Sequence, residues 1–222
     1  MVLEKYNRWV NHPNIDPVLK EELLGMDDKA KNDAFYTNIE FGTAGMRGLL
    51  GAGTNRINVH TIRKANVGFA NYICGLGEEA KKKGIAIGYD NRHMSYEFAM
   101  DSAKVLSAYG ITVYVFESLR PTPVLSFAVR ELGCTSGIVI TASHNPSKYN
   151  GYKCYDPAGY QMTDKAALET YGFIQKVDMF EDIKMRVYST LENPNVYGEY
   201  LLFCELYGRL AGQGKILMNL NI

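Results

Sequence analysis

Residues 136–153 read SGIVITASHNPSKYNGYK, and this stretch decides the fold that the sequence predicts. Residues 136–141 are β-branched and apolar, which is typical of a buried strand. The dipeptides Asn145-Pro146 and Asn150-Gly151 then favour turns that end the strand and present Ser143 at its carboxyl end. In an open α/β sheet, ligands bind at that edge, so we expect chemistry around Ser143.

The serine hydroxyl is open to two interpretations from its neighbours. His144 is the next residue and points to the opposite face of an extended segment, so we discount a hydrolase triad. Backbone N–H groups of a tight loop together with Lys153 would instead stabilise the charge of a phosphoryl group on Ser143. These residues alone are equally compatible with an ordinary connection between a strand and a turn.

Alternating elements surround this stretch and indicate the α/β class. Apolar periodicity and turn residues predict strands at 85–90, 112–116, 137–141 and 152–155, and helices at 59–83, 95–109, 123–132 and 163–177. Ser95 is predicted as the N-cap of its helix. Such alternation predicts a mainly parallel, mixed sheet with helices on both faces and residues 152–155 as an antiparallel edge.

The rest of the chain predicts two flanking units. Residues 1–40 form a helical N-terminal arm with helices at 1–12, 16–24 and 28–36, separated by proline and glycine. Residues 41–177 form the α/β body. Residues 178–222 are predicted to be a linker and the incomplete start of a second domain, with a helix at 196–210 and a tail at 212–222.

Composition excludes several classes of partner. The formal net charge of the 222 residues is +0, so we expect neither a nucleic-acid nor a membrane partner. No apolar run is long enough to span a bilayer. The four cysteines lie far apart, which predicts reduced thiols and a cytoplasmic location: Cys74, Cys134, Cys154 and Cys204.

Three ordered motifs resemble the α-D-phosphohexomutases, the phosphoglucomutase and phosphomannomutase family. Residues 143–153 are similar to the phosphoserine loop of that family. Residues 41–48, FGTAGMRG, resemble its N-terminal glycine-rich motif, and residues 51–58, GAGTNRIN, extend the match in the manner of the phosphoglucomutase-2-like branch. Residues 88–92, GYDNR, are similar to the Gly-x-Asp-x-Arg segment that lies between the two. Three motifs in order carry far more weight than one.

The resemblance implies both a fold and an activity. For residues 41–177 it implies a three-layer α/β/α sandwich that carries the phosphoserine loop. The family activity is an intramolecular phosphotransfer that interconverts hexose 1-phosphate and 6-phosphate through a phosphoserine, here Ser143. The implied substrate is a small-molecule sugar phosphate. The implied cofactors are Mg²⁺, bound to Ser143 through its phosphate, and an activator of the glucose 1,6-bisphosphate type.

The resemblance also suggests roles for polar residues of the matching motifs. Lys153 is the candidate cation or proton-transfer group, and Arg47 is the candidate phosphate clamp, since a guanidinium contacts two phosphate oxygens at once. His144 either positions the phosphoryl group and exchanges protons or is a hydrogen-bonded loop residue. Asn145 is assigned to phosphate or substrate binding, with a side chain that fixes the loop by bonding to backbone.

Three further residues are predicted to support the loop. Asp90 and Arg92 are expected to form an ion pair beside it, and Asn150 is expected to bond to the backbone. Neither the Asp-x-Asp-x-Asp magnesium loop nor the sugar and distal phosphate loops of the family occur in the sequence. The chain is therefore expected to be truncated and weakly active or inactive alone. The alternative is a non-catalytic α/β module that binds phosphate or a phosphosugar. The choice among glucose, mannose and pentose phosphates stays open.

Overall fold

The computed structural model describes residues 1–42 and 45–186. Three short helices form the N-terminal arm and confirm the predicted helices there: α1 (Val2–Asn11), α2 (Pro17–Leu24) and α3 (Asp28–Phe35). The Asp16 carboxylate accepts hydrogen bonds from the backbone N–H groups of Val18 and Leu19, and Asp27 accepts one from Ala30. Side-chain caps of this kind satisfy the N–H groups that a first helical turn leaves without partners.

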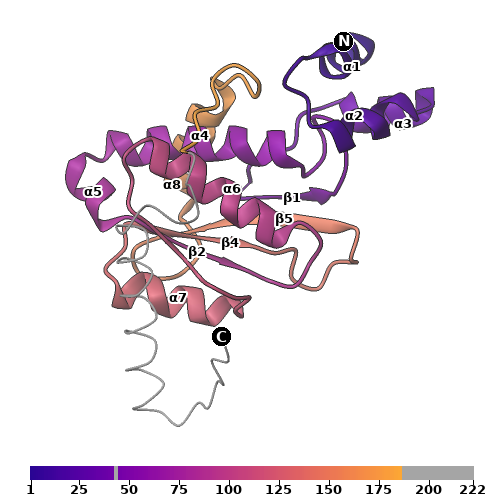
Figure 1. The fold of residues 1–222 in the computed structure, drawn as a ribbon. Helices are drawn as coiled ribbons and strands as arrows, with labels where there is room; N and C mark the ends of the chain where they lie inside the picture. Colours follow the sequence, from indigo (N-terminus) through magenta and orange to yellow (C-terminus); the bar gives the residue numbers. More distant parts are fainter. Residues whose placement is uncertain (43–44, 187–222) are drawn as a thin grey trace.

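A mixed sheet of five strands forms the centre of the described residues (Figure 1). Its order is β1 (Gly45–Leu49), β5 (Tyr149–Tyr155), β4 (Ser136–Ile140), β2 (Ile85–Tyr89) and β3 (Val113–Val115). Strand β2 pairs in parallel with β3 and β4, whereas β5 is antiparallel to both β4 and β1. The predicted strand at 152–155 is confirmed as antiparallel. It is not an edge strand, however, because β1 pairs with its other side.

The strand β1 is the element that the sequence prediction missed. It contains Gly45 and Gly48, and glycine gives a segment the composition of a loop. Its pairing with β5 makes the sheet less parallel than predicted, since two of the four pairings between the described strands are antiparallel. Cross-strand pairing with β5, rather than local propensity, therefore holds this segment extended.

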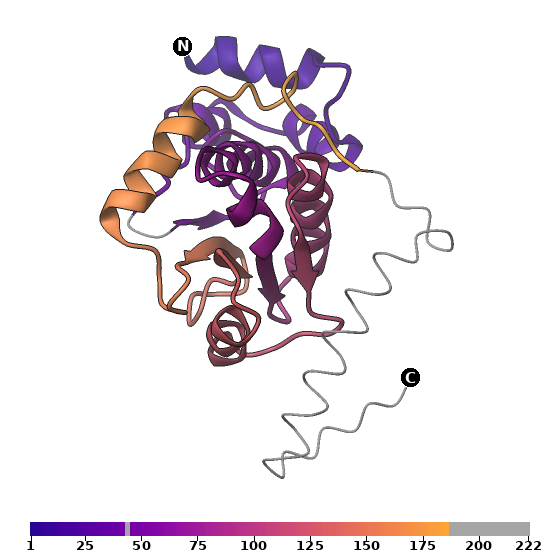
Figure 2. The ribbon, with the colours of Figure 1, turned by 90° about the vertical axis from the view of Figure 1, so that its left-hand side faces the viewer.

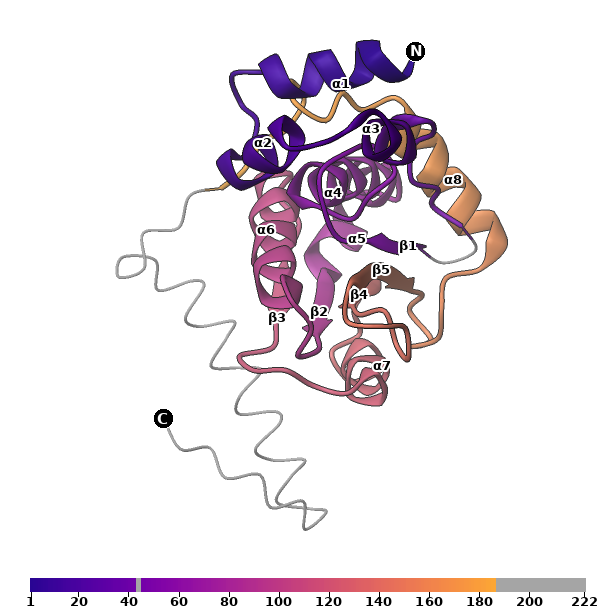
Figure 3. The same ribbon diagram turned by 90° about the vertical axis from the view of Figure 1, so that its right-hand side faces the viewer.

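Helices lie on both faces of the sheet, as the prediction of an α/β/α sandwich requires (Figures 1 and 3). On one face lie α4 (Val59–Gly75) and α6 (Ser95–Ala108), with α8 (Asp164–Gln175) packed along α4. The other face is covered by α7 (Thr122–Glu131). The first interface buries Phe69, Ile87, Phe98, Ile138 and Tyr152, and the second buries Phe116, Leu125 and Val129.

The packing of α8 on α4 depends on one glycine. A Cβ atom at Gly68 would lie 2.5 Å from the Cα atom of Ile174, which is closer than two carbon atoms can approach. Any larger residue at position 68 would push the two helices apart. The Met162, Ala167 and Ile174 side chains are consequently part of the same core as the sheet.

Two predicted helix boundaries are wrong. The helix predicted at 59–83 ends at Gly75, and a separate short helix, α5 (Glu78–Lys83), follows Gly77, whose φ is 101°. Glycine adopts that conformation without steric cost. Ser95 is not the N-cap of α6, because Met94 occupies that position and the Ser95 hydroxyl donates to Oδ1 of Asp90 at 2.7 Å.

After α8 the chain passes beside the arm (Figure 2). Phe180 packs in the same buried cluster as Trp9, and the Arg8 guanidinium donates to the Asp178 carboxylate. No helix among residues 1–42 and 45–186 is long and apolar enough to cross a membrane. The helix predicted at 196–210 and the tail at 212–222 lie outside the described residues, and the division into domains stays a prediction.

Candidate active site

Ser143 lies in the loop that follows β4, at the carboxyl end of the parallel strands. Its side chain is exposed and its φ is 56°, in the left-handed region that few residues other than glycine adopt. The Ser143 backbone N–H donates to Oγ1 of Thr141 at 3.0 Å. The loop therefore presents the serine hydroxyl to solvent in a defined backbone conformation.

Lys153 contacts the serine hydroxyl directly. Its Nζ atom lies 2.6 Å from Oγ of Ser143 and donates a hydrogen bond to it. The antiparallel return of β5 makes this possible, because it sets Lys153 opposite Val139 in β4. Burial is the main cause that lowers the pKa of Lys153 and the Arg47 charge adds to it, whereas Asp90 acts in the opposite direction.

Arg47 supplies a second positive charge beside this pair. It is exposed on β1, opposite Gly151 of β5, and it is close enough for its charge to act on Lys153. Among the described residues it forms no hydrogen bond or ion pair. The structure thus brings together the serine, the lysine and the arginine that the sequence selected, although they come from three different segments.

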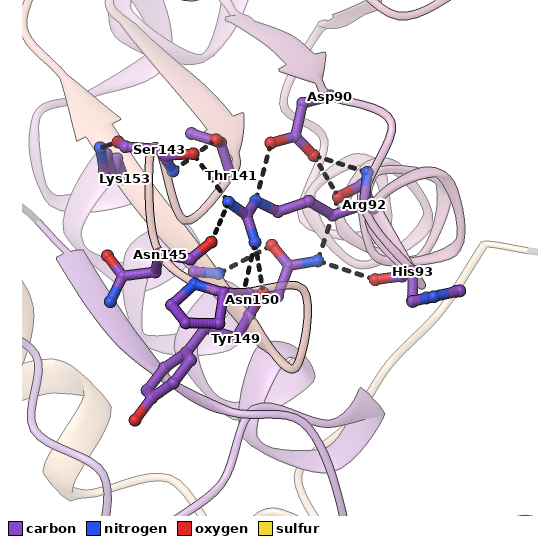
Figure 4. A network of polar contacts seen from close by, with 12 residues as sticks. Asp90, Arg92, His93, Thr141, Ser143, Asn145, Tyr149, Asn150 and Lys153 are labelled. Carbon is purple, nitrogen blue, oxygen red and sulfur yellow. Dashed lines mark hydrogen bonds and ion pairs between the residues drawn. The ribbon is translucent and has the colours of Figure 1, made fainter.

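Arg92 holds the loop in place (Figure 4). Its Nη1 donates to the carbonyl oxygens of Pro146 at 3.0 Å and Tyr149 at 3.1 Å. Its Nη2 donates to the carbonyl oxygens of Ser143 at 2.7 Å and Asn145 at 2.6 Å. One guanidinium therefore satisfies four carbonyl groups of an irregular segment, which a strand or a helix would satisfy by backbone pairing.

A small polar network fixes this arginine and the end of the loop. Nε of Arg92 lies 3.3 Å from Oδ2 of Asp90, so the expected ion pair is present. The buried Asn150 amide donates to the His93 carbonyl at 2.9 Å and to Oγ of Ser95 at 3.0 Å. Ser95 in turn donates to Asp90, which pairs with Arg92. The start of α6 is therefore linked to the loop through Arg92 and to the residue that follows the loop, Asn150.

Two predicted residues are placed differently from the expectation. The Asn145 side chain does not fix the loop, since its buried Oδ1 has no hydrogen-bond partner and its backbone N–H and C=O make the loop contacts instead. His144 is exposed and forms no hydrogen bond within the part of the chain that the structure describes. Their roles toward a phosphoryl group stay predictions.

A complete metal site is not formed by the described residues. No group of three or more His, Cys, Asp or Glu side chains converges within residues 1–42 and 45–186. Asp90 is the carboxylate whose charge reaches Lys153, but its oxygens already contact Arg92 and Ser95. Mg²⁺ takes several hard oxygen ligands, so the residues present fit at most one position of its coordination sphere, through Ser143.

Comparison with known proteins decides the family. A family model described as phosphoglucomutase/phosphomannomutase, alpha/beta/alpha domain I, matches residues 38–180, which is more than half of the chain. The chain belongs to the phosphoglucomutase/phosphomannomutase family. The matched region contains all of the residues placed around Ser143 in this site.

Relatives of known name agree with this family membership. Phosphoglucomutases from Staphylococcus aureus strains USA300 and MRSA252 are each 41% identical to the chain over 169 residues. These matches cover 76% of this chain and 30% of each relative. The chain thus spans less than a third of the length of these curated phosphoglucomutases.

Solved structures share the fold. A protein from Thermus thermophilus with a provisional phosphomannomutase name superposes with a TM-score of 0.57 at 27% identity, over 68% of this chain and 33% of that one. A phosphoglucomutase/phosphomannomutase family protein from Burkholderia thailandensis gives a TM-score of 0.52 at 24% identity, over 66% of this chain and 31% of the other. The second likeness bears on the fold alone.

Two residues that support this phosphoglucomutase/phosphomannomutase loop are not predicted by the sequence as site residues. The first is Thr141, which the sequence predicts only as a strand residue, although a hydroxyl two positions before Ser143 is a recognised turn spacing. Ser95 had no such signal, because it lies far from the loop in sequence and reaches it only through the packing of α6.

Proposed function

We propose that this chain carries the phosphoserine domain of a mutase that interconverts hexose 1-phosphate and hexose 6-phosphate, with glucose phosphate as the expected substrate. The observation that supports it most is the contact between Oγ of Ser143 and Nζ of Lys153, in a chain of this family. Because the chain covers 30% of its phosphoglucomutase relatives, the activity is proposed for the complete protein.

In the proposed reaction, a hydroxyl oxygen of the sugar monophosphate forms a bond to phosphorus as the bond from phosphorus to Oγ of Ser143 breaks. Lys153 is protonated at the start and gives a proton to the departing Oγ, and the proton lost by the sugar hydroxyl restores the lysine. The return step reverses these bonds with the other phosphate of the bisphosphate. Arg47 offsets the negative charge on the oxygens of the transferred phosphoryl group. The remaining rate acceleration comes from holding the sugar hydroxyl and the phosphoryl group in position.

We further propose the conditions that the complete protein requires. Mg²⁺ would neutralise charge on the phosphoryl group, with Ser143 contributing one ligand through its phosphate and the other ligands coming from outside the described residues. A glucose 1,6-bisphosphate-type compound would load the serine. A cytoplasmic location, with neither nucleic-acid nor membrane partners, completes the proposal.

The second candidate function is a module that binds a phosphoryl group without turnover. It is favoured by the lack of any converging cluster of three or more His, Cys, Asp or Glu side chains within residues 1–42 and 45–186, which leaves those residues without a metal site of their own. The two functions differ in one respect that an experiment resolves, namely whether Ser143 forms a covalent bond to phosphorus.

The test is phosphorylation, by glucose 1,6-bisphosphate and Mg²⁺, of the complete protein that contains these 222 residues, followed by intact-mass measurement and peptide mapping. We expect one phosphoryl group, on Ser143, and none on the Ser143→Ala variant. Ser147→Ala is the matched control, since Ser147 is an exposed serine of the same loop. Phosphate on another residue would refute the assignment, and reversible binding without phosphorylation would select the second function.

A further inference from the structure

A cavity of about 260 Å³ lies between the N-terminal arm, α4 and α8, away from the Ser143 loop. Met46 of β1 lines it, whereas Arg47, the next residue along the strand, points to the opposite face of the sheet. The cavity therefore lies behind the strand that borders the proposed active site. It has room for roughly nine water-sized groups at about 30 Å³ each.

Lys64 of α4 is the charged side chain that lines this cavity. It is half-buried, and it forms no hydrogen bond or ion pair with any residue in 1–42 and 45–186. Asp178 is the acidic group that acts on it, but the Asp178 carboxylate already accepts from Arg8 and from the backbone N–H of Phe180. Burial lowers the pKa of Lys64, which agrees with an ammonium group that lacks a partner.

Neutral donors line the cavity together with this ammonium group. Tyr171 and Gln175 of α8 form no side-chain hydrogen bonds within the described chain. The Asn38 side-chain carbonyl oxygen accepts from Lys5, which leaves its amide N–H groups for another acceptor. A half-buried cation beside several donors matches an oxygen anion, because such an anion accepts hydrogen bonds at each of its oxygens.

The remainder of the wall is apolar and limits the kind of anion. It is formed by Ile39, Phe41, Met46, Ile174 and Met179. A sugar phosphate would leave its hydroxyl groups without partners against this wall, at a cost for each buried polar group. A ligand with one charged end and an apolar body would satisfy both halves of the cavity.

We propose that this cavity binds a small monocarboxylate with an apolar body, whose carboxylate pairs with Lys64 and whose apolar part lies against Phe41, Met46 and Ile174. A single negative charge is favoured because Lys64 is the only cation among the described lining residues. The site is separate from Ser143, so the proposal does not depend on the proposed function.

Benzoate is the probe for this site. The 222-residue chain is titrated with benzoate, and binding is measured by isothermal titration calorimetry and by the shift of amide signals in NMR spectra. We expect saturable binding with signal changes concentrated in α4, α8, β1 and residues 38–41. Benzamide has the same shape without the charge, and we expect it to bind at least tenfold more weakly. Equal binding of the two compounds, or no saturation with benzoate, would overturn the proposal.

Variants at position 64 test whether the charge of Lys64 is required for benzoate binding. Lys64→Met keeps most of the side-chain volume and should weaken benzoate binding tenfold or more, while Lys64→Arg should stay within a few-fold of the original. Lys165→Met removes an exposed lysine of α8 and should change nothing. Circular dichroism checks that each variant is folded. Unchanged affinity in a folded Lys64→Met chain would refute the site, and Ser143→Ala should leave benzoate binding intact.

Discussion

The Ser143 loop and the N-terminal arm are fixed to the same core by opposite means. The loop is exposed and is held by directed hydrogen bonds from Arg92 to backbone carbonyl groups. The arm is held by aromatic rings, with Trp9 5.6 Å from Phe35 and 5.5 Å from Phe180 between ring centroids. Directed bonds define a shape, whereas apolar burial supplies stability. Changes in the arm should therefore alter the free energy of unfolding, and changes around the loop should alter geometry and reactivity.

Trp9→Ala should give the largest effect. Trp9 is 2% exposed and contacts three rings, so its removal should lower the free energy of unfolding by about 4 kcal/mol, as large aromatic deletions do. Urea unfolding followed by circular dichroism measures the loss. Tyr36→Ala, at an exposed position of the same arm, should lower stability far less. A loss below about 1 kcal/mol would mean that the arm contributes little to the fold.

His60 should make the stability of the arm depend on pH. Burial first, and the Arg63 charge second, lower the pKa of His60 from 6.5 to about 4, and its Nε2 accepts a hydrogen bond from the Asp16 N–H. The folded chain favours the neutral ring of His60. The stabilisation of the fold by this neutral ring is therefore complete above pH 6.5 and is lost as pH falls toward 4. The loss should be about 3 kcal/mol.

The pH effect has a matched variant. His60→Gln places an uncharged acceptor near the position of Nε2 and cannot gain a proton in this range. Unfolding measured at several pH values between about 4 and 7 should therefore show a flatter dependence in the variant than in the original chain. Identical slopes would show that other groups cause the acid sensitivity.

Lys153→Met tests the loop by its reactivity. In the complete protein, loss of the cation that contacts Oγ of Ser143 should slow phosphorylation of the serine by about a hundredfold, close to 2.7 kcal/mol in the barrier, with little change in melting. The rate is measured by mass spectrometry under single-turnover conditions. Lys148→Met, an exposed lysine of the same loop, should react normally. A melting change with a normal rate would assign Lys153 a structural role only.

Arg92→Lys tests whether directed bonds hold the loop. One ammonium group cannot reach four carbonyl groups, so residues 142–149 should exchange their amide hydrogens faster, while stability falls by only about 1–2 kcal/mol. Hydrogen–deuterium exchange measured by mass spectrometry resolves this segment. Arg130→Lys, at an exposed position of α7, is the control. Unchanged exchange in the loop would remove Arg92 from this role.

The difference in stability between Ser143→Gly and Ser143→Ala should be the smallest effect, with the glycine variant the more stable of the two. Because the φ of Ser143 is 56°, glycine fits this backbone without strain, whereas alanine does not. The glycine variant should be more stable than Ser143→Ala by about 0.5–1 kcal/mol, measured by denaturant unfolding. The reverse order would show that the loop is not held in the left-handed conformation in solution.

Local sequence patterns predicted most of the elements, and the motifs that resemble the family singled out the candidate site residues. Helix caps, apolar periodicity and turn dipeptides act over a few residues, so the arm, the βα alternation and the exposed position of Ser143 could be predicted. The same reasoning failed where local composition favours a different structure from the one that the fold adopts. The two cases are β1, whose glycines are typical of a loop, and the break in the helix after Gly75.

Only the tertiary structure decided which of these residues meet. The contact of Lys153 with Ser143 depends on the register of β5 against β4, and the bonds from Arg92 depend on where α6 sits. The cavity at Lys64 exists because α8 packs beside α4 and the arm. These contacts join segments far apart in the chain, and a one-residue change of register moves a side chain to the other face of the sheet. Local propensity carries no such information, so long-range packing alone sets them.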